Sequence, residues 1–138
     1  MKLDKDSKIA AMARVPLFER CSHSELARIA KIVDEVNVRA GKVLTREGAR
    51  AREFFVILEG TADVRRDTRL LPRLGPGDFL GEIGLVTDCP RTATVTALTP
   101  MRVVVLTARA FAALMRTQPE IQHNVLETVA ARLSRDAI

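Results

Sequence analysis

A group of residues that could hold a phosphorylated sugar stands beyond the middle of the chain. Residues 77–85 read Gly-Asp-Phe-Leu-Gly-Glu-Ile-Gly-Leu, and residues 90–95 read Pro-Arg-Thr-Ala-Thr-Val. Glycines let backbone N–H groups approach an anion closely, and a helix opening at Ile83 would direct its first N–H groups outward. The guanidinium of Arg91 can bind two phosphate oxygens at once. This combination of residues predicts an anion-binding site.

Strand periodicity indicates that Arg91 points into the protein. The small apolar residues Ala93, Val95 and Ala97 alternate with threonines, and Arg91 shares their parity. Because an unpaired buried charge is costly, Arg91 needs an anion there. Glu82, nine residues earlier, could supply it in a structural ion pair. Two interpretations therefore stay open, namely ligand binding and an internal pair between Glu82 and Arg91.

Composition indicates an ordinary soluble domain. The chain has 138 residues, of which 47% are apolar and 28% charged, and its net charge is +5. This length suffices for one domain with its own core. With no Trp, no Tyr and five Phe, aromatic platforms for nucleic-acid bases are scarce, so direct nucleic-acid binding is not expected. Neither a signal peptide nor a membrane-spanning run is recognisable, and the lone Cys21 and Cys89 suit a reducing compartment, so we expect a cytoplasmic protein.

The periodicity changes twice along the chain. Helices are expected first, where Ser22 and Glu25 have the spacing of a capping box. Short apolar runs separated by glycines then predict an antiparallel β unit, in which residues 54–58 and 61–66 form a hairpin. The further expected strands are residues 70–74, 92–98 and 102–106. A helix around Phe111 and a last helix over 119–135 follow, the latter with the apolar stripe Ile121, Val125, Val129 and Leu133.

The order of these elements predicts the fold class. Helices, then strands, then helices indicate an α+β fold, an antiparallel β-roll or jelly-roll barrel flanked by helices. We expect a single domain over 1–138. Its N-terminal helices would occupy 1–34, its β-roll 35–107 and its C-terminal helices 108–138.

Residues 81–85 and 90–97 together resemble the phosphate-binding cassette of cyclic nucleotide-binding domains of the cAMP-receptor type. The resemblance extends to Pro-Leu-Phe at 16–18, to residues 41–48 and 54–60, and to Leu-Gly-Pro-Gly-Asp-Phe at 74–79. It implies a regulatory module that binds cAMP, or cGMP, and needs no cofactor and no metal. We refer to residues 77–97 as the cassette.

The resemblance also implies a role for each cassette residue. Arg91 would pair with the cyclic phosphate, and Glu82 would accept from the ribose 2′-hydroxyl. Backbone N–H groups of Ile83, Gly84 and Thr92 would complete the cradle that begins at Gly81. Thr92 leaves the choice between cAMP and cGMP open, and Gly84 departs from the family's usual alanine while offering the same N–H group.

The last helix would be the lid over the purine, with Val129, Arg132 or Leu133 nearest the base. An alternative for these three residues is simple packing of an amphipathic helix on the barrel or on a second copy. No second domain follows in the sequence, so the output is expected in an unidentified effector domain or protein, with a homodimer as one possibility.

Three other functions compete with a sensor module. The chain could be the sensor half of a Crp/Fnr-like transcriptional regulator, or a degenerate domain in which Glu82 and Arg91 pair and no ligand binds. A metal-dependent barrel enzyme needs several converging histidines. Since His23 and His123 both fall in expected helices outside the barrel, we expect no catalysis.

Overall fold

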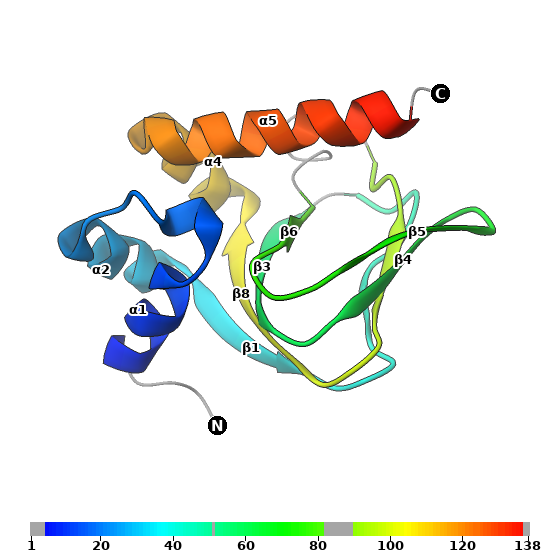
Figure 1. The fold of residues 1–138 in the computed structure, drawn as a ribbon, viewed down its shortest axis with the longest axis horizontal. Coiled ribbons are helices and arrows are strands. Elements are labelled where there is room, and N and C mark those ends of the chain that lie inside the picture. The colour runs from blue at the N-terminus through cyan, green and yellow to red at the C-terminus, as the bar shows by residue number, and fades with distance from the viewer. Residues whose placement is uncertain (1–4, 51, 82–89, 137–138) are drawn as a thin grey trace.

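The computed structural model of the chain describes residues 5–50, 52–81 and 90–136 (Figure 1). Helix α1 (Lys5–Ala13), the 3-10 helix η1 (Pro16–Phe18) and helix α2 (His23–Ile32) come first. Helices α4 (Ala108–Thr117) and α5 (Pro119–Asp136) come last. Between them lie the strands β1 (Asp34–Val38), β2 (Val43–Thr45), β3 (Glu53–Glu59), β4 (Ala62–Arg66), β5 (Arg69–Leu74), β6 (Phe79–Leu80), β7 (Thr94–Ala97) and β8 (Met101–Thr107).

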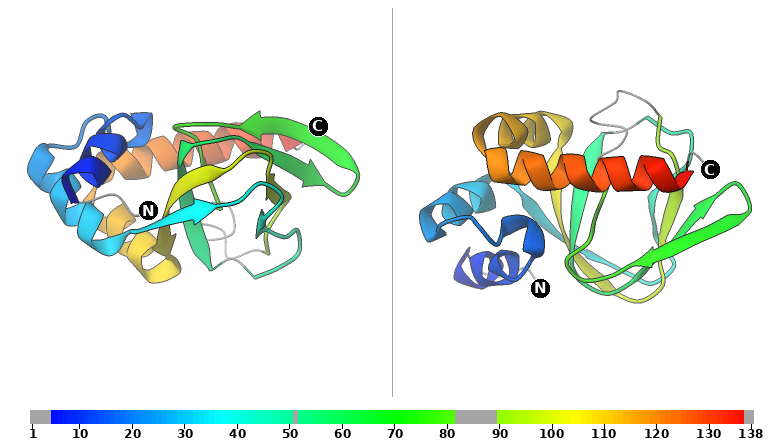
Figure 2. Two further views of the ribbon diagram at one scale, coloured as in Figure 1. Left: turned by 90° about the horizontal axis from the view of Figure 1, so that it is seen from below. Right: turned by 45° about the horizontal axis from the view of Figure 1, so that its top comes forward.

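The strands pair into two four-stranded antiparallel sheets. Their orders are β1-β8-β3-β6 and β2-β7-β4-β5. The two sheets face each other as a β-roll, and Figure 2 shows the helices gathered at one end of it, with α5 leaving that end to run along the roll. The predicted α+β fold with an antiparallel β-roll and flanking helices is confirmed.

Two apolar clusters lie on opposite faces of the first sheet. Phe54, Val56 and Leu106 pack against buried residues of the helices. Phe55 and Ile57 face the other way, into the space between the two sheets. Because β3 buries both faces, its sequence is a continuous apolar run without the alternation of a half-exposed strand.

The predicted hairpin of residues 54–58 with 61–66 is wrong. Strand β3 pairs with β6 and β8, whereas β4 pairs with β5 and β7 in the other sheet. The chain passes from one sheet to the other at Gly60, which has a φ of +95°. The actual hairpin is β4–β5, closed where Arg66 faces Arg69. Because both faces of β3 are buried, the helices cover one face and the second sheet covers the other. The next strand, β4, belongs to that second sheet and therefore does not pair with β3.

The predicted start of α2 is confirmed. Ser22 is its N-cap, and its Oγ accepts from the backbone N–H of Glu25 at 3.2 Å. In return, the Ser22 N–H donates to Glu25 Oε1 at 2.9 Å, which completes the capping box. The backbone N–H of Ser22 thereby lowers the pKa of Glu25. At the other end of α2, Lys8 Nζ donates to the carbonyls of Ala30 and Val33 and so joins α1 to α2.

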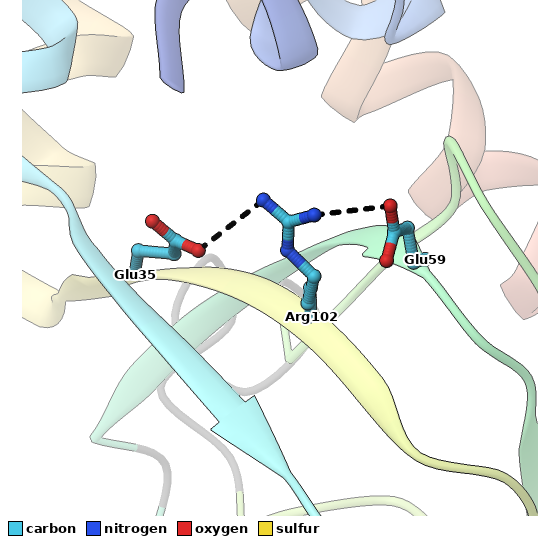
Figure 3. Close-up of polar contacts among 3 residues, drawn as sticks. All are labelled: Glu35, Glu59 and Arg102. Carbon is cyan, nitrogen blue, oxygen red and sulfur yellow. Dashed lines mark hydrogen bonds and ion pairs between the residues drawn. The ribbon is translucent and has the colours of Figure 1, made fainter. Parts of the chain in front are cut away.

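A charged cluster joins three strands of the first sheet (Figure 3). Arg102 on β8 lies between Glu35 on β1 and Glu59 on β3, with N···O distances of 3.5 Å and 3.1 Å. Glu35 is buried, whereas Glu59 is exposed. Burying Glu35 requires a nearby opposite charge, because an isolated carboxylate would pay a large desolvation penalty. Arg102 therefore helps to hold β1 and β3 in place on either side of β8.

The crossover at Gly60 supplies a test of the fold. A Cβ on Gly60 would lie 2.5 Å from the carbonyl oxygen of Pro100 and 2.9 Å from Met101 Cα. Gly41 has a similar φ of +89°, but a Cβ there would meet nothing within 4 Å. The two glycines therefore separate the cost of a left-handed backbone from the cost of overlap.

We expect Gly60→Ala to lower the free energy of unfolding by about 2–4 kcal/mol, because left-handed strain adds to overpacking. Gly41→Ala, which meets only the strain, should cost about 1–2 kcal/mol. Equilibrium unfolding in urea measures both values. Equal costs for the two variants would show that the tight crossover at Gly60 is wrong.

Candidate functional site

Arg91 lies at the point where three separate segments meet. Its side chain is buried, with 8% of the residue exposed. Nη1 donates to the carbonyl oxygen of Gly81 at 2.9 Å, and Nη2 donates to that of Glu53 at 2.5 Å. The guanidinium thus links the turn after β6 to the first residue of β3. Its burial agrees with the parity argument, although β7 begins only at Thr94.

The backbone of Arg91 is held by the loop between β2 and β3. Its N–H donates to the carbonyl of Ala49 at 2.7 Å, and its own carbonyl accepts from the N–H of Gly48 at 2.8 Å. Two residues farther on, the Ala93 carbonyl accepts from Thr45 Oγ1 at 3.1 Å. These backbone hydrogen bonds fix the position of the Arg91 Cα, and the carbonyls of Gly81 and Glu53 fix the position of its guanidinium.

Gly81 is needed for space as well as for its backbone angle. Its φ is +93°, which L side chains rarely adopt. A Cβ at this position would overlap the Arg91 guanidinium and would lie 2.7 Å from the carbonyl oxygen of Glu53. The structure thus brings together two of the predicted site residues, Gly81 and Arg91.

Thr92 lies next to Arg91 and is half-buried. Its carbonyl accepts from Arg66 Nε at 2.8 Å. Arg66 is a neighbour of the cassette that the sequence analysis did not single out. The signal was available, because Arg66 shares the strand parity of Ala62 and Val64, both of which are buried.

Several predicted site residues are not positioned by the structure. Glu82, Ile83 and Gly84, with the helix expected to open at Ile83, lie outside the described residues. The Glu82 roles, as ribose ligand or as structural partner of Arg91, both stay predictions. Val129, Arg132 and Leu133 fall on α5, as expected from the sequence, and their contact with a base likewise stays a prediction.

By residue type, the histidines and Cys21 are candidates for metal binding and for nucleophilic chemistry. No three His, Cys, Asp or Glu residues among them gather closely enough to hold a metal ion. His23 begins α2, and His123 on α5 lies 2.9 Å from Glu127. Burial raises the pKa of the Cys21 thiol, and the nearby Glu25 adds to this effect. Cys21 is therefore protonated at neutral pH and a poor nucleophile.

The chemistry of this arrangement is that of anion recognition. A guanidinium offers five N–H donors in a planar fork, and carbonyl oxygens at Gly81 and Glu53 hold that fork in one orientation. In a buried position its attraction for an oxyanion is less screened than at the surface.

None of the helices in the described part of the chain is long and apolar enough to cross a bilayer.

Comparisons with known proteins agree with this geometry. Residues 35–118 match the family model of the cyclic nucleotide-binding domain. A cAMP-dependent protein kinase regulatory subunit of Mycosarcoma maydis is 37% identical over 110 residues, which cover 73% of this chain and 21% of that protein. A CRP-like cAMP-activated global transcriptional regulator of Mycobacterium tuberculosis is 30% identical over 129 residues, which cover 90% of this chain and 58% of the regulator.

A solved structure described as Sp-2Cl-cAMPS bound to PKAR CBD2 has the same fold. Its TM-score is 0.81 at 22% sequence identity, and the match covers 99% of this chain and 96% of the other. The chain spans less than two thirds of the length of either curated relative. The family model covers more than half of the chain, including Gly81, Arg91 and Thr92. The chain therefore belongs to the cyclic nucleotide-binding domain family.

Proposed function

We propose that residues 1–138 form one regulatory domain that binds cAMP and signals through the position of α5. The observation that carries this proposal is Arg91, a buried guanidinium held in one orientation by the carbonyls of Gly81 and Glu53. The domain is a binding module in the cytoplasm and has no catalytic role. The names of two relatives, cAMP-dependent and cAMP-activated, support cAMP as the ligand.

Arg91 binds the cyclic phosphate through its fork of N–H groups, which matches the spacing of phosphate oxygens. Glu82 accepts a hydrogen bond from the ribose 2′-hydroxyl. Backbone N–H groups of Ile83, Gly84 and Thr92 supply further donors to the phosphate. Each role suits the chemistry of the residue, since carboxylates accept from hydroxyls and backbone N–H groups bind anions.

The purine packs against aliphatic side chains, since the chain has neither Trp nor Tyr. Thr92 is compatible with either purine, so cGMP is the competing ligand. Competition between the two nucleotides for one site measures this preference directly.

Signalling requires α5 to have two positions with different affinities for the ligand. Ile121 and Val125, in the first half of α5, are buried in the apolar cluster between the helices and the first sheet. The second half carries the proposed lid residues Val129, Arg132 and Leu133, and Figure 1 shows the helix passing along the roll. The first half would serve as the anchor, and the second half would close over the base.

The signal is transmitted to an effector domain or to a partner protein. A transcriptional regulator of the Crp/Fnr type, in which this chain is the sensor half, is the second candidate. It is favoured by the match to a CRP-like regulator over 90% of the chain.

We expect Arg91→Ala to weaken cAMP binding by at least about 100-fold, because hydrogen bonds between charged groups contribute about 1.5–3 kcal/mol each. The affinity of Arg91→Lys for cAMP should fall between those of the wild type and Arg91→Ala, since a lysine keeps the positive charge but loses the planar fork of N–H donors. Isothermal titration calorimetry with cAMP measures this, with Arg73→Ala as a control for an exposed arginine. Circular dichroism of each variant separates lost binding from lost folding. Equal binding by the wild type and by folded Arg91→Ala, or none by the wild type, would refute the proposal.

We expect 2′-deoxy-cAMP to bind about 10–100-fold more weakly than cAMP, because it cannot donate a hydrogen bond to Glu82. In Glu82→Gln the preference for cAMP over 2′-deoxy-cAMP should shrink to about threefold or less. Competition titrations with both nucleotides on both proteins measure this, and Glu19→Gln is the control for lost charge. A preference that survives unchanged in Glu82→Gln would assign the 2′-hydroxyl to another residue.

A further inference from the structure

A basic pocket lies beside Arg91, where the turn after β1, strand β2 and the loop before β3 form its lining. Its volume is about 540 Å³. Its basic lining residues are Arg39, Lys42, Arg46, Arg50, Arg52 and Arg91. Among the lining residues that the structure describes, Glu53 is the one acidic residue. A hollow of this size and charge fits a compact anion.

Five of the basic residues that line this pocket are exposed, and none of the five is paired with an acidic residue in the described part of the chain. Among the described part of the chain, the side chains of the five exposed basic residues form neither an ion pair nor a hydrogen bond. Glu47, which follows Arg46 directly in the sequence, instead accepts from the backbone N–H of Asp67 at 2.7 Å. The Glu47 carboxylate thus points toward the β4–β5 hairpin and does not pair with the arginines that line the pocket.

The backbone that carries these arginines is held in place. Arg46 and Arg50 flank Gly48 and Ala49, which bond to the backbone of Arg91 at 2.8 Å and 2.7 Å. On the other rim, Lys42 is fixed by its carbonyl, which accepts from the N–H of Ala97 at 2.9 Å. Fixed attachment points reduce the entropy lost when an anion is bound.

We propose that this pocket is a second ligand site, which binds a polyphosphate group. Several adjacent positive charges favour a multiply charged anion over a single carboxylate. None of the described lining residues is aromatic, so a nucleobase would gain no stacking from them and the phosphates carry the recognition. The group can come from free polyphosphate or from a nucleoside triphosphate.

Calorimetric titration with sodium tripolyphosphate, without any cyclic nucleotide, tests the site. The wild type should bind one tripolyphosphate per chain, and the double variant Arg46→Glu with Arg50→Glu should bind at least about 100-fold more weakly. The matched control is Arg14→Glu with Arg73→Glu, which makes the same change in net charge at exposed positions outside the pocket. It should retain affinity within about threefold.

Titration with ATP identifies the source of the polyphosphate group. An affinity for ATP equal to that for tripolyphosphate means that the phosphates suffice, and a higher affinity means that the nucleoside is also bound. Either result supports the site. The proposed site would be overturned if tripolyphosphate did not bind to the wild type, or if both double variants lost the same affinity for tripolyphosphate. It would also be overturned if the wild type bound an acidic peptide but not tripolyphosphate.

Arg91 couples this pocket to the cassette, because Arg91 is one of the lining residues and its guanidinium bonds to the Gly81 carbonyl. This step rests on the proposed function. Saturating tripolyphosphate should weaken cAMP binding by at least about fivefold, since both anions draw on one guanidinium. The Arg46→Glu, Arg50→Glu variant should bind cAMP without responding to tripolyphosphate.

The two proposals can fail separately. If cAMP does not bind, the proposed function fails, whereas direct titration with tripolyphosphate still decides the pocket. If both ligands bind and neither changes the affinity of the other, the coupling through Arg91 is wrong.

Discussion

Burial of the Arg91 guanidinium is the constraint on which the rest of the site depends. A buried guanidinium must have its N–H groups satisfied, and here two of the acceptors are backbone carbonyls at Gly81 and Glu53. The turn after β6, the start of β3 and the loop before β3 must therefore meet at one point. Gly81 makes this possible, because any Cβ there would occupy the space of the guanidinium.

The β-roll supplies the rigid frame for this meeting point. Strands β3 and β8 are buried on both faces, between the helices and the second sheet. The segment after Arg91 is bonded to β2 through Thr45, and the loop before β3 is bonded to Arg91 itself. A ligand at the cassette would thus act against a fixed strand framework. Helix α5 is anchored to this framework by Ile121 and Val125.

Features with a local signature could be predicted from the sequence. The capping box at Ser22, the burial of Arg91 and the order of helices and strands each follow from residue types at short spacing. The pairing of β3 could not be predicted, because an apolar run indicates that a strand is buried but does not indicate which strand it pairs with. The acceptors of Arg91 were also missed, since a backbone carbonyl has no residue type to mark it. The role of Glu82 came from resemblance and stays a prediction.

A crystal structure of the protein with cAMP tests the central claim most directly. The account predicts a cyclic phosphate oxygen within about 3 Å of an Arg91 Nη atom, with the ribose 2′-hydroxyl at the Glu82 carboxylate. A structure in which Arg91 bonds only to protein groups, including Glu82, while cAMP is absent from the cassette at saturating concentration would contradict it.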